Sequence, residues 1–293
     1  MPALNSASHQ FSLDAREFKL FRTLIHGRTG IWLADGKQIM LASRLSKRLR
    51  HLGMTSFSEY YQLVQAGGDG SSEIGELINC VTTNKTSFFR EPHHFEFLLE
   101  TVVPEILAST GNRDKTISVW SAACSTGEEP YSIALTLVEA LRMARAASVT
   151  GWQIKVTASD IDTKVLEKAA AGVYDGNALD SVPVALQKKY FLRGKGQMAG
   201  SVKIKQEVSS KVHFQRINLM DSVWALKGPY DAIFFRNALI YFQQETQDAF
   251  LRKMARQLRP RGYIVLGHSE HIPWLHEVLE PLNKTIYRLR DHR

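Results

Sequence analysis

Hydrophobic and polar positions in the first part of the chain repeat with the period of an α-helix. Apolar residues recur every three or four positions in successive segments, and glycines separate several of them. The segments run from Ser12–Asp14 to Gly27, over Gln38–Leu52, from Ser56 to Val64 and from about Ser72 to Val81. We therefore expect an all-α N-terminal domain over residues 1–82.

The pattern changes in the second part, where short apolar runs alternate with segments of helical period. These runs are rich in β-branched and aromatic residues, which is typical of buried strands. The expected strands are Ile117–Trp120, Gln153–Asp160, Pro229–Asn237, Tyr263–Leu266 and Thr285–Leu289. The alternation predicts an α/β domain over residues 93–293, with a seven-stranded, mostly parallel sheet that ends in a hairpin.

A further stretch, about residues 191–217, differs from both patterns. It contains glycines and two alternating runs, Val202–Ile204 and Val212–Phe214. We expect these runs to form a small antiparallel β-subdomain that is inserted into the α/β domain.

The segment Ile117–Leu137 predicts a strand, a turn of small residues and a helix, with Pro130 at the first helical position. Such a turn places a small ligand at the carboxyl edge of a parallel sheet. The turn has a single glycine, Gly127, followed by Glu128 and Glu129, so the three-glycine dinucleotide motif is absent. The two carboxylates disfavour a diphosphate and favour a cationic ligand such as S-adenosylmethionine. Alternatively, they merely stabilise the helix N-terminus through its dipole, and the turn alone leaves both interpretations open.

A second acid favours the ligand interpretation. Asp160 ends the next expected strand, where an acidic residue accepts hydrogen bonds from ribose hydroxyls in sheets of this type. Asp160 could instead cap the following helix. Asp162 or Thr163 can cap it equally well, which leaves Asp160 for the ligand.

The two domains are joined by residues 83–92. This connector combines Asn84, Thr86 and Arg90 with the pair Phe88–Phe89. Polar groups among buried aromatic rings suit a lid over a ligand, and we expect the connector to contribute to the cofactor site. The alternative is a helix start that Thr86 caps.

Composition and charge narrow the classes of partner. The 293-residue chain has a formal charge of +8, which indicates an acidic partner, and it shows no RNA-binding signature. Five Lys and Arg and no acid lie between Lys37 and His51. The helix over residues 38–52 therefore presents a basic face, which either binds an acidic protein surface or is simply solvated. The basic residues with helical spacing are Arg44, Lys47, Arg48 and His51.

The remaining composition indicates a cytoplasmic protein. The chain has two cysteines, a short polar N-terminus and no run of about 20 apolar residues. We expect no membrane insertion and no nucleic-acid partner. We also expect no metal site, since the group His268–His271 follows a strand and lacks further ligands.

Taken together, these segments resemble the CheR-type chemotaxis receptor methyltransferases. The resemblance extends from about Phe18 to Arg288 and depends on the order of its segments as much as on each one. The segments are TTNKTSFFRE, WSAACSTGEEPYSIA, ASDIDTKVLEKA, YFLRGKG and FFRNALIYF. The resemblance implies a Rossmann-like methyltransferase domain that uses S-adenosylmethionine and releases S-adenosylhomocysteine. It also implies that the enzyme methylates glutamate side chains on the cytoplasmic helices of chemoreceptors.

The resemblance also implies roles for particular residues. Glu129 would hold the methionyl ammonium, Asp160 the ribose, and Arg90 and Tyr241 would lie nearest the transferred methyl as catalytic residues. The residues expected to line the cofactor site are Asn84, Thr86, Arg90, Glu129, Asp160, Asn218, Leu219, Arg236 and Asn237. The β-subdomain of some members grips a pentapeptide at the receptor C-terminus, and we expect the enzyme to be a monomer.

Two other functions remain as alternatives. A nucleic-acid methyltransferase fits the positive charge. However, an amino methyltransferase often has an Asn/Asp-Pro-Pro-aromatic turn, where this chain has Arg236-Asn237-Ala238-Leu239. A receptor-binding scaffold without turnover would keep the fold, although the intact acids of the cofactor turns argue against it.

Overall fold

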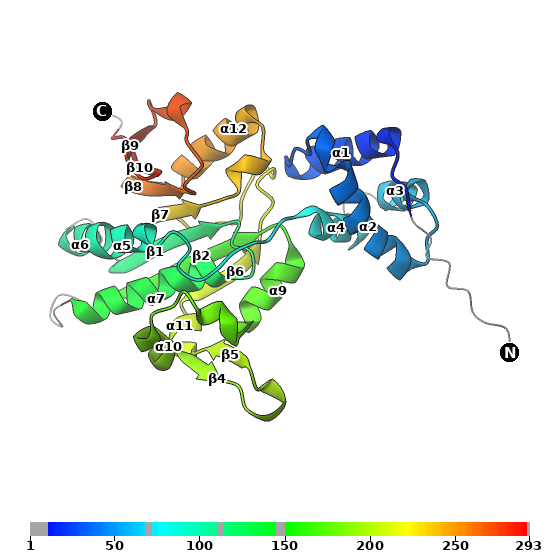
Figure 1. Cartoon of the computed structure of the whole chain (residues 1–293). Coiled ribbons are helices and arrows are strands. Elements are labelled where there is room, and N and C mark those ends of the chain that lie inside the picture. Colours follow the sequence, from blue (N-terminus) through cyan, green and yellow to red (C-terminus); the bar gives the residue numbers. More distant parts are fainter. Residues whose placement is uncertain (1–10, 68–71, 110–113, 145–149, 292–293) are drawn as a thin grey trace. The chain divides into compact units, whose positions relative to one another are not determined.

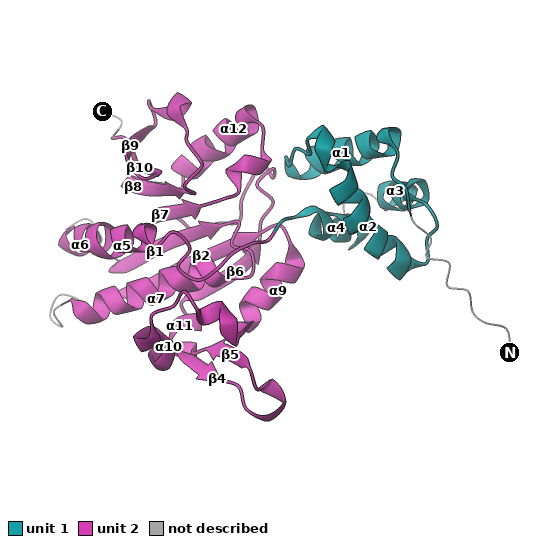
Figure 2. Ribbon diagram, in the orientation of Figure 1, with its two compact units in different colours: residues 1–83 teal, residues 84–293 magenta. Residues whose placement is uncertain are grey.

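The computed structural model describes residues 11–67, 72–109, 114–144 and 150–291. The chain divides into two compact units, Met1–Thr83 and Asn84–Arg293 (Figure 2). This division lies one residue beyond the expected end of the helical domain at residue 82, and it assigns residues 84–92 to the second unit. Among the described residues, no helix combines the length and the apolar character that crossing a membrane requires.

The first unit is helical (Figure 1). Its elements are α1 (Ala15–Thr29), η1 (Asp35–Lys37), α2 (Gln38–Leu52), α3 (Phe57–Ala66) and α4 (Ser72–Val81). Asp14 begins α1 with a capping box, since its side chain accepts the Glu17 N–H and Glu17 accepts the Asp14 N–H. The predicted end of α1 at Gly27 was wrong. Gly30, at φ +75°, ends the helix instead because a residue in the left-handed region is needed there.

The second unit is an α/β domain. Its helices are α5 (His93–Phe97), the π-helical segment η2 (Leu98–Val102), α6 (Val103–Ala108), α7 (Glu128–Met143), α9 (Thr163–Ala171), η3 (Gly176–Leu179), α10 (Val184–Tyr190), η4 (Gly196–Met198), α11 (Gln206–Ser209), η5 (Leu239–Tyr241), α12 (Gln244–Ala255) and η6 (Pro273–Leu275). Its strands are β1 (Thr116–Ala122), β2 (Gln153–Asp160), β3 (Val173–Asp175), β4 (Phe191–Arg193), β5 (Ser201–Ile204), β6 (Val212–Arg216), β7 (Tyr230–Phe235), β8 (Leu258–Leu266), β9 (Leu279–Asn283) and β10 (Ile286–Leu289).

Seven of these strands form the main sheet, in the order β6-β2-β1-β7-β8-β10-β9. The pairs from β6 to β8 are parallel, and β10 is antiparallel to both β8 and β9. The predicted seven-stranded, mostly parallel sheet with a terminal hairpin is therefore confirmed. The parallel arrangement brings the carboxyl ends of β1, β2 and β7 together at one edge.

Each face of the sheet has its own apolar core. Ile117 and Val119 pack with α5, α6 and α7 on one face, whereas Trp120 packs with α12 on the other. β7 divides in the same way, because Phe234 belongs to the first core and Phe235 to the second. This alternation follows from the two-residue period of a strand. A slip of one residue would move each side chain into the opposite core, so the alternation fixes the register of the strands and the position of their carboxyl ends.

The inserted β-subdomain has different strands from those we predicted. A three-stranded antiparallel sheet is present, in the order β3-β5-β4, so β3 at residues 173–175 belongs to it. The expected partner Val212–Phe214 is instead part of β6, which pairs in parallel with β2 at the edge of the main sheet. The residues between β5 and β6 form the helical turn α11 rather than a hairpin turn. Alternation alone does not say which of two sheets a short strand joins.

Candidate active site

The turn after β1 carries the first set of site residues. Gly127 caps α7 at φ +96°, a conformation that glycine adopts without strain. A Cβ atom at this position would lie 2.8 Å from Ala169 Cβ and 2.9 Å from the Tyr174 hydroxyl oxygen. The helix begins at Glu128, two residues before Pro130, so the predicted start at Pro130 was wrong. The glycine therefore allows α7 and α9 to approach closely around the turn.

Asp160 connects the ends of β1 and β2. Its Oδ2 accepts the Ser125 N–H at 2.8 Å and its Oδ1 accepts the Asp162 N–H at 3.0 Å. Asp162 caps α9, as one of the two predicted candidates, and also accepts a hydrogen bond from the Asn84 side chain at 2.8 Å. Asp160 itself does not cap α9, and its side chain accepts hydrogen bonds only from backbone N–H groups of the neighbouring turns in the part of the chain that the structure describes. Each carboxylate oxygen nevertheless accepts more than one hydrogen bond, so capacity for a diol remains.

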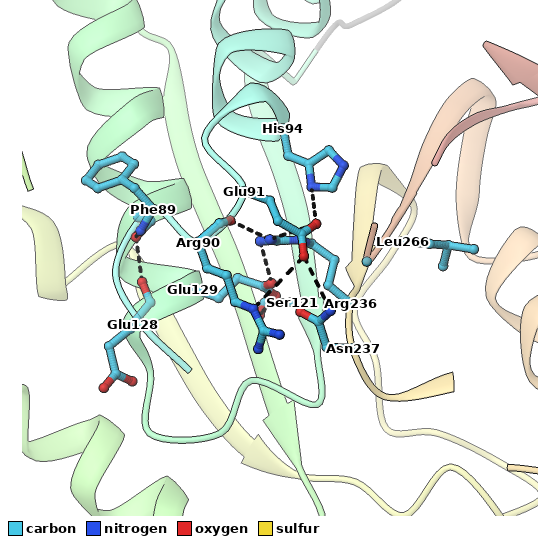
Figure 3. Close-up of polar contacts among 12 residues, drawn as sticks. Phe89, Arg90, Glu91, His94, Ser121, Glu128, Glu129, Arg236, Asn237 and Leu266 are labelled. Atoms are coloured by element: carbon cyan, nitrogen blue, oxygen red, sulfur yellow. Dashed lines mark hydrogen bonds and ion pairs between the residues drawn. The ribbon is translucent and has the colours of Figure 1, made fainter. Parts of the chain in front are cut away.

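Glu129 lies at the buried end of the site, where Arg236 contacts it. Its Oε2 is 3.1 Å from Arg236 Nη1, and its Oε1 accepts the Ser121 hydroxyl at 2.7 Å (Figure 3). Burial raises the pKa of Glu129, and the Arg236 charge opposes this rise. Burial likewise raises the pKa of Asp160, against the hydrogen bonds from Asp162 and Ser125. Two carboxyls buried in this way favour a ligand that brings positive charge and hydrogen-bond donors.

Glu91 gathers side chains from several elements around the connector (Figure 3). Its carboxylate lies 3.4 Å from Arg236 Nη2 and accepts the Asn237 side chain at 3.4 Å. It also accepts the His268 N–H at 3.1 Å and faces the His268 Nδ1 at 3.1 Å. Burial raises the pKa of Glu91, but Arg236 and these hydrogen bonds outweigh it, so the net pKa is lowered. Glu91 therefore holds the connector against the Arg236–Asn237 turn.

A second acid, Glu270, holds the same turn from the other side. Its Oε2 accepts the N–H groups of Asn237 at 2.8 Å and Gly267 at 2.7 Å. Gly267 allows this approach, because a Cβ there would lie 2.4 Å from the Asn237 side-chain nitrogen. Glu270 therefore fixes the Arg236–Asn237 turn to the end of β8.

Strained backbone gathers around these contacts. Five non-glycine residues near the site have positive φ angles, and they are Phe89, Glu91, Ala123, Ser125 and Asn237. Such conformations cost free energy and persist where surrounding contacts enforce them, as at binding sites.

The other expected site residues come from the same edge. Arg90 is half-buried, donates to the Lys85 carbonyl at 3.0 Å, and its own carbonyl accepts a hydrogen bond from Arg236. Asn218 follows β6 and its side-chain oxygen accepts the Met220 N–H at 3.1 Å. Leu219 is partly buried and packs against the core on the α12 face of the sheet, and Tyr241 ends η5 just after the Arg236–Asn237 turn. Thr86 lies half-buried in the connector, which is not helical there, so the alternative of a helix start at Thr86 was wrong.

Sequence reasoning missed Glu91, Ser121 and Ser125 as parts of this site. Glu91 directly follows Arg90 and precedes Pro92, and an acid next to a site arginine was the available signal. Nothing in the sequence distinguishes Ser121 or Ser125 from other small turn residues.

In the first unit, the four basic residues of α2 divide into two pairs. Arg44 donates to the carbonyl oxygens of Val81 and Thr82, and Arg48 pairs with Glu73 at 2.6 Å. Lys47 and His51 are exposed.

The site fits S-adenosylmethionine in its donors and acceptors. Glu129 offers a carboxylate for an ammonium group, and Asp160 offers acceptors for a diol. The buried Nε of Arg236 lacks a hydrogen-bond partner among the described residues. Fold and site together define an S-adenosylmethionine-dependent methyltransferase with an added all-α domain.

Comparison with known proteins gives the family. Residues 84–288 match the CheR methyltransferase, SAM binding domain, and residues 16–82 match the CheR methyltransferase, all-alpha domain. The chain therefore belongs to the CheR methyltransferase family. It is 42% identical to a chemotaxis protein methyltransferase of Klebsiella aerogenes, over 99% of this chain and 95% of that protein. The proteins of the same name from Salmonella typhimurium and Escherichia coli are 42% and 41% identical, each over 96% of this chain and 93% of the relative.

Proposed function

We propose that the enzyme methylates glutamate carboxylates on the cytoplasmic helices of chemoreceptors, and so acts in the cytoplasm. The observation that carries this proposal is the near full-length similarity to chemotaxis protein methyltransferases, which includes the all-α domain. A scaffold role is disfavoured by the intact set of acids around the cofactor turns.

Methyl ester formation requires little proton chemistry. A glutamate side chain has an ordinary pKa of about 4.3, so the nucleophile is already ionised at neutral pH. Bound S-adenosylmethionine supplies an electrophilic methyl group on a sulfonium. The protein has to bind the carboxylate in line with this methyl and remove water from it.

Arg90 and Tyr241 are the residues that we assign to this task. The Arg90 guanidinium is partly exposed and can pair with the incoming carboxylate. Tyr241 lies at the end of η5, after the turn that Glu91 and Glu270 hold, and its hydroxyl can border the methyl or donate to a carboxylate oxygen.

We assign a protein residue to each recognisable group of the cofactor. We assign the methionyl ammonium to Glu129 and the ribose to Asp160. Arg236 contacts Glu129 and opposes the rise that burial causes in its pKa. The remaining residues of the proposed cofactor site are Asn84, Thr86, Arg90, Asn218, Leu219 and Asn237.

The exposed side of α2 is our proposed receptor surface. Lys47 and His51 are exposed on it, together with Arg50, and no acid lies on this helix. Arg44 and Arg48 contribute positive potential from positions where they also stabilise the helical unit. Such a face suits the acidic helices that carry methylation sites.

The β-subdomain is our proposed anchor for a receptor C-terminal pentapeptide. β4 is an edge strand of its sheet, and Leu192 on it is 53% exposed. An edge strand can bind an extended peptide by strand addition, with exposed side chains giving specificity. A monomer would leave this edge available.

A transfer assay tests the function. Enzyme, tritiated S-adenosylmethionine and receptor-containing membranes should yield labelled receptor whose label is released by mild alkali, because methyl esters hydrolyse and methylamines do not. Stable label on protein or label on RNA would contradict the proposal. Saturable cofactor binding without any transfer would favour a scaffold.

A further inference from the structure

His94 is a fully buried histidine beside the connector. Its Nε2 lies 3.0 Å from the Lys284 carbonyl oxygen, which requires a proton on this nitrogen. Its Nδ1 therefore carries a lone pair, and it has no hydrogen-bond donor among the described residues. This lone pair points at Glu91 Oε2, 3.4 Å away (Figure 3). The His94 lone pair is thus buried without a donor beside a carboxylate oxygen, and a cation between the two would satisfy it.

His93 supplies a third ligand atom at the same place. The His93 and His94 rings are 4.1 Å apart between centroids. One ligand atom from each of Glu91, His93 and His94 lies within 4.8 Å of the other two. A tetrahedral zinc ion with bonds of about 2.0–2.1 Å needs ligand atoms about 3.3 Å apart, which is close to the 3.4 Å between Glu91 and His94.

The environment prepares both imidazoles for metal binding. Burial, followed by the charge of Arg236, lowers the pKa of His94 to about 4, and burial, followed by the charge of Lys284, lowers the pKa of His93, which favours the neutral form that binds metals. The bond from His94 Nε2 to a backbone carbonyl is the orienting contact that metal-bound histidines commonly make.

We propose that Glu91, His93 and His94 form a binding site for a divalent transition metal such as Zn²⁺. Two neutral imidazoles and one carboxylate are ligands that Zn²⁺ accepts, and a water molecule would complete a tetrahedral set. Ca²⁺ and Mg²⁺ prefer oxygen ligands and should not compete.

Occupancy of this site would inhibit methyl transfer. The Glu91 oxygen that faces His94 is also 3.4 Å from Arg236 Nη2, so a metal ion competes with Arg236 for it. Arg236 in turn contacts Glu129. Metal binding would therefore weaken the support of the cofactor site through one shared guanidinium.

The test uses the full-length enzyme without a histidine tag. Co²⁺ is titrated in the absence of cofactor and followed by its visible d–d absorption, and Zn²⁺ is then added as competitor. Wild type should bind one equivalent of Co²⁺ with tetrahedral bands that Zn²⁺ abolishes. His93→Gln should weaken the affinity by about tenfold or more, whereas the exposed His271→Gln serves as control and should bind as wild type does.

Activity gives a second readout. Zn²⁺ should inhibit methyl transfer by the wild type reversibly, with chelator restoring it, and His93→Gln should resist inhibition. Absence of binding by wild type, or equal Co²⁺ affinity in wild type and His93→Gln, overturns the proposal. Loss of binding in His271→Gln to the same extent also overturns it. Because binding is read without methyl transfer, failure here is distinguishable from failure of the proposed glutamate specificity.

Discussion

Arg236 and Glu129 form a buried ion pair at the carboxyl edge of the main sheet, with 3.1 Å between Nη1 and Oε2. The Arg236 side chain is 1% exposed, and its second terminal nitrogen contacts Glu91 and the Arg90 carbonyl. One guanidinium therefore joins the first turn of α7, the turn after β7 and the connector. A planar group with five donors can do this, whereas an ammonium cannot.

Arg236→Lys should weaken cofactor binding although it conserves charge. Lysine loses the contact to Glu129 or those to Glu91, and we expect a loss of affinity for S-adenosylhomocysteine of about 10- to 100-fold, as one to two buried charged contacts predict. Calorimetry measures it. Arg142→Lys is the matched control, since Arg142 pairs with Glu207 in an exposed position, and it should leave affinity unchanged.

Arg90→Ala and Tyr241→Phe should separate catalysis from binding. If Arg90 orients the carboxylate, Arg90→Ala should lower kcat for methyl transfer by about 100-fold or more. Tyr241→Phe should lower kcat while cofactor affinity stays close to wild type. A variant with normal cofactor binding and near wild-type turnover would remove its residue from the mechanism.

Gly127→Ala should both destabilise the protein and impair cofactor binding. The new Cβ would lie less than 3.0 Å from atoms of Ala169 and Tyr174, and φ +96° is strained for alanine. We therefore expect the free energy of unfolding to fall by about 2–4 kcal/mol. Gly75→Ala in α4 is the opposite case, because its Cβ meets nothing within 4 Å and the residue is helical. Urea unfolding should show a gain of about 0.5–1 kcal/mol there, and equal effects of both changes would contradict the argument.

The stability of the α/β unit should depend on Asp231 between pH 4 and 7. Burial raises the pKa of this carboxyl to about 6, from a model-peptide value of 3.8, against its bond from the Ser118 N–H and the Arg259 charge. The folded state thus binds more protons than the unfolded state in this interval, so the Asp231 contribution falls as the pH rises. Asp231→Asn removes this titration. Its free energy of unfolding should therefore rise relative to that of wild type by up to about 3 kcal/mol between pH 4 and 7. Unfolding curves at both pH values measure it, with Asp175→Asn, at an exposed position, as the matched control.

Charge reversal on α2 should impair receptor methylation alone. Lys47→Glu should lower the kcat/KM for receptor about tenfold and leave cofactor affinity unchanged, because Lys47 is exposed. Lys19→Glu on α1, also exposed, is the control of equal charge. Equal losses in both variants would indicate a general effect of net charge rather than a receptor surface on α2.

The sequence predicted the long periodic elements well, but it did not predict which sheet a short strand joins. α2, α4 and β2 have the predicted bounds, because an apolar stripe or a buried strand specifies each of them locally. β6 was assigned to the wrong sheet, since its alternating pattern suits a small antiparallel sheet and the edge of the main sheet equally.

The candidate site shows the same division. Glu129 and Asp160 were accessible to sequence reasoning because acids at the ends of parallel strands meet at one edge. Glu91 was not, because its importance depends on its approach to Arg236 and His268, which are 145 and more residues away in the chain. The lone pair of His94 depends on a contact to Lys284, which the sequence does not indicate.

Tyr174 belongs to β3 of the inserted sheet, and its hydroxyl donates to the Thr126 carbonyl at 2.9 Å. The two ends of this insert therefore tolerate changes of sequence to different degrees. The hairpin tip at residues 195–199 can change length or composition to suit a new peptide, since its backbone hydrogen bonds are local. The strand that bears Tyr174 cannot shift by even one position without losing this bond to the turn after β1.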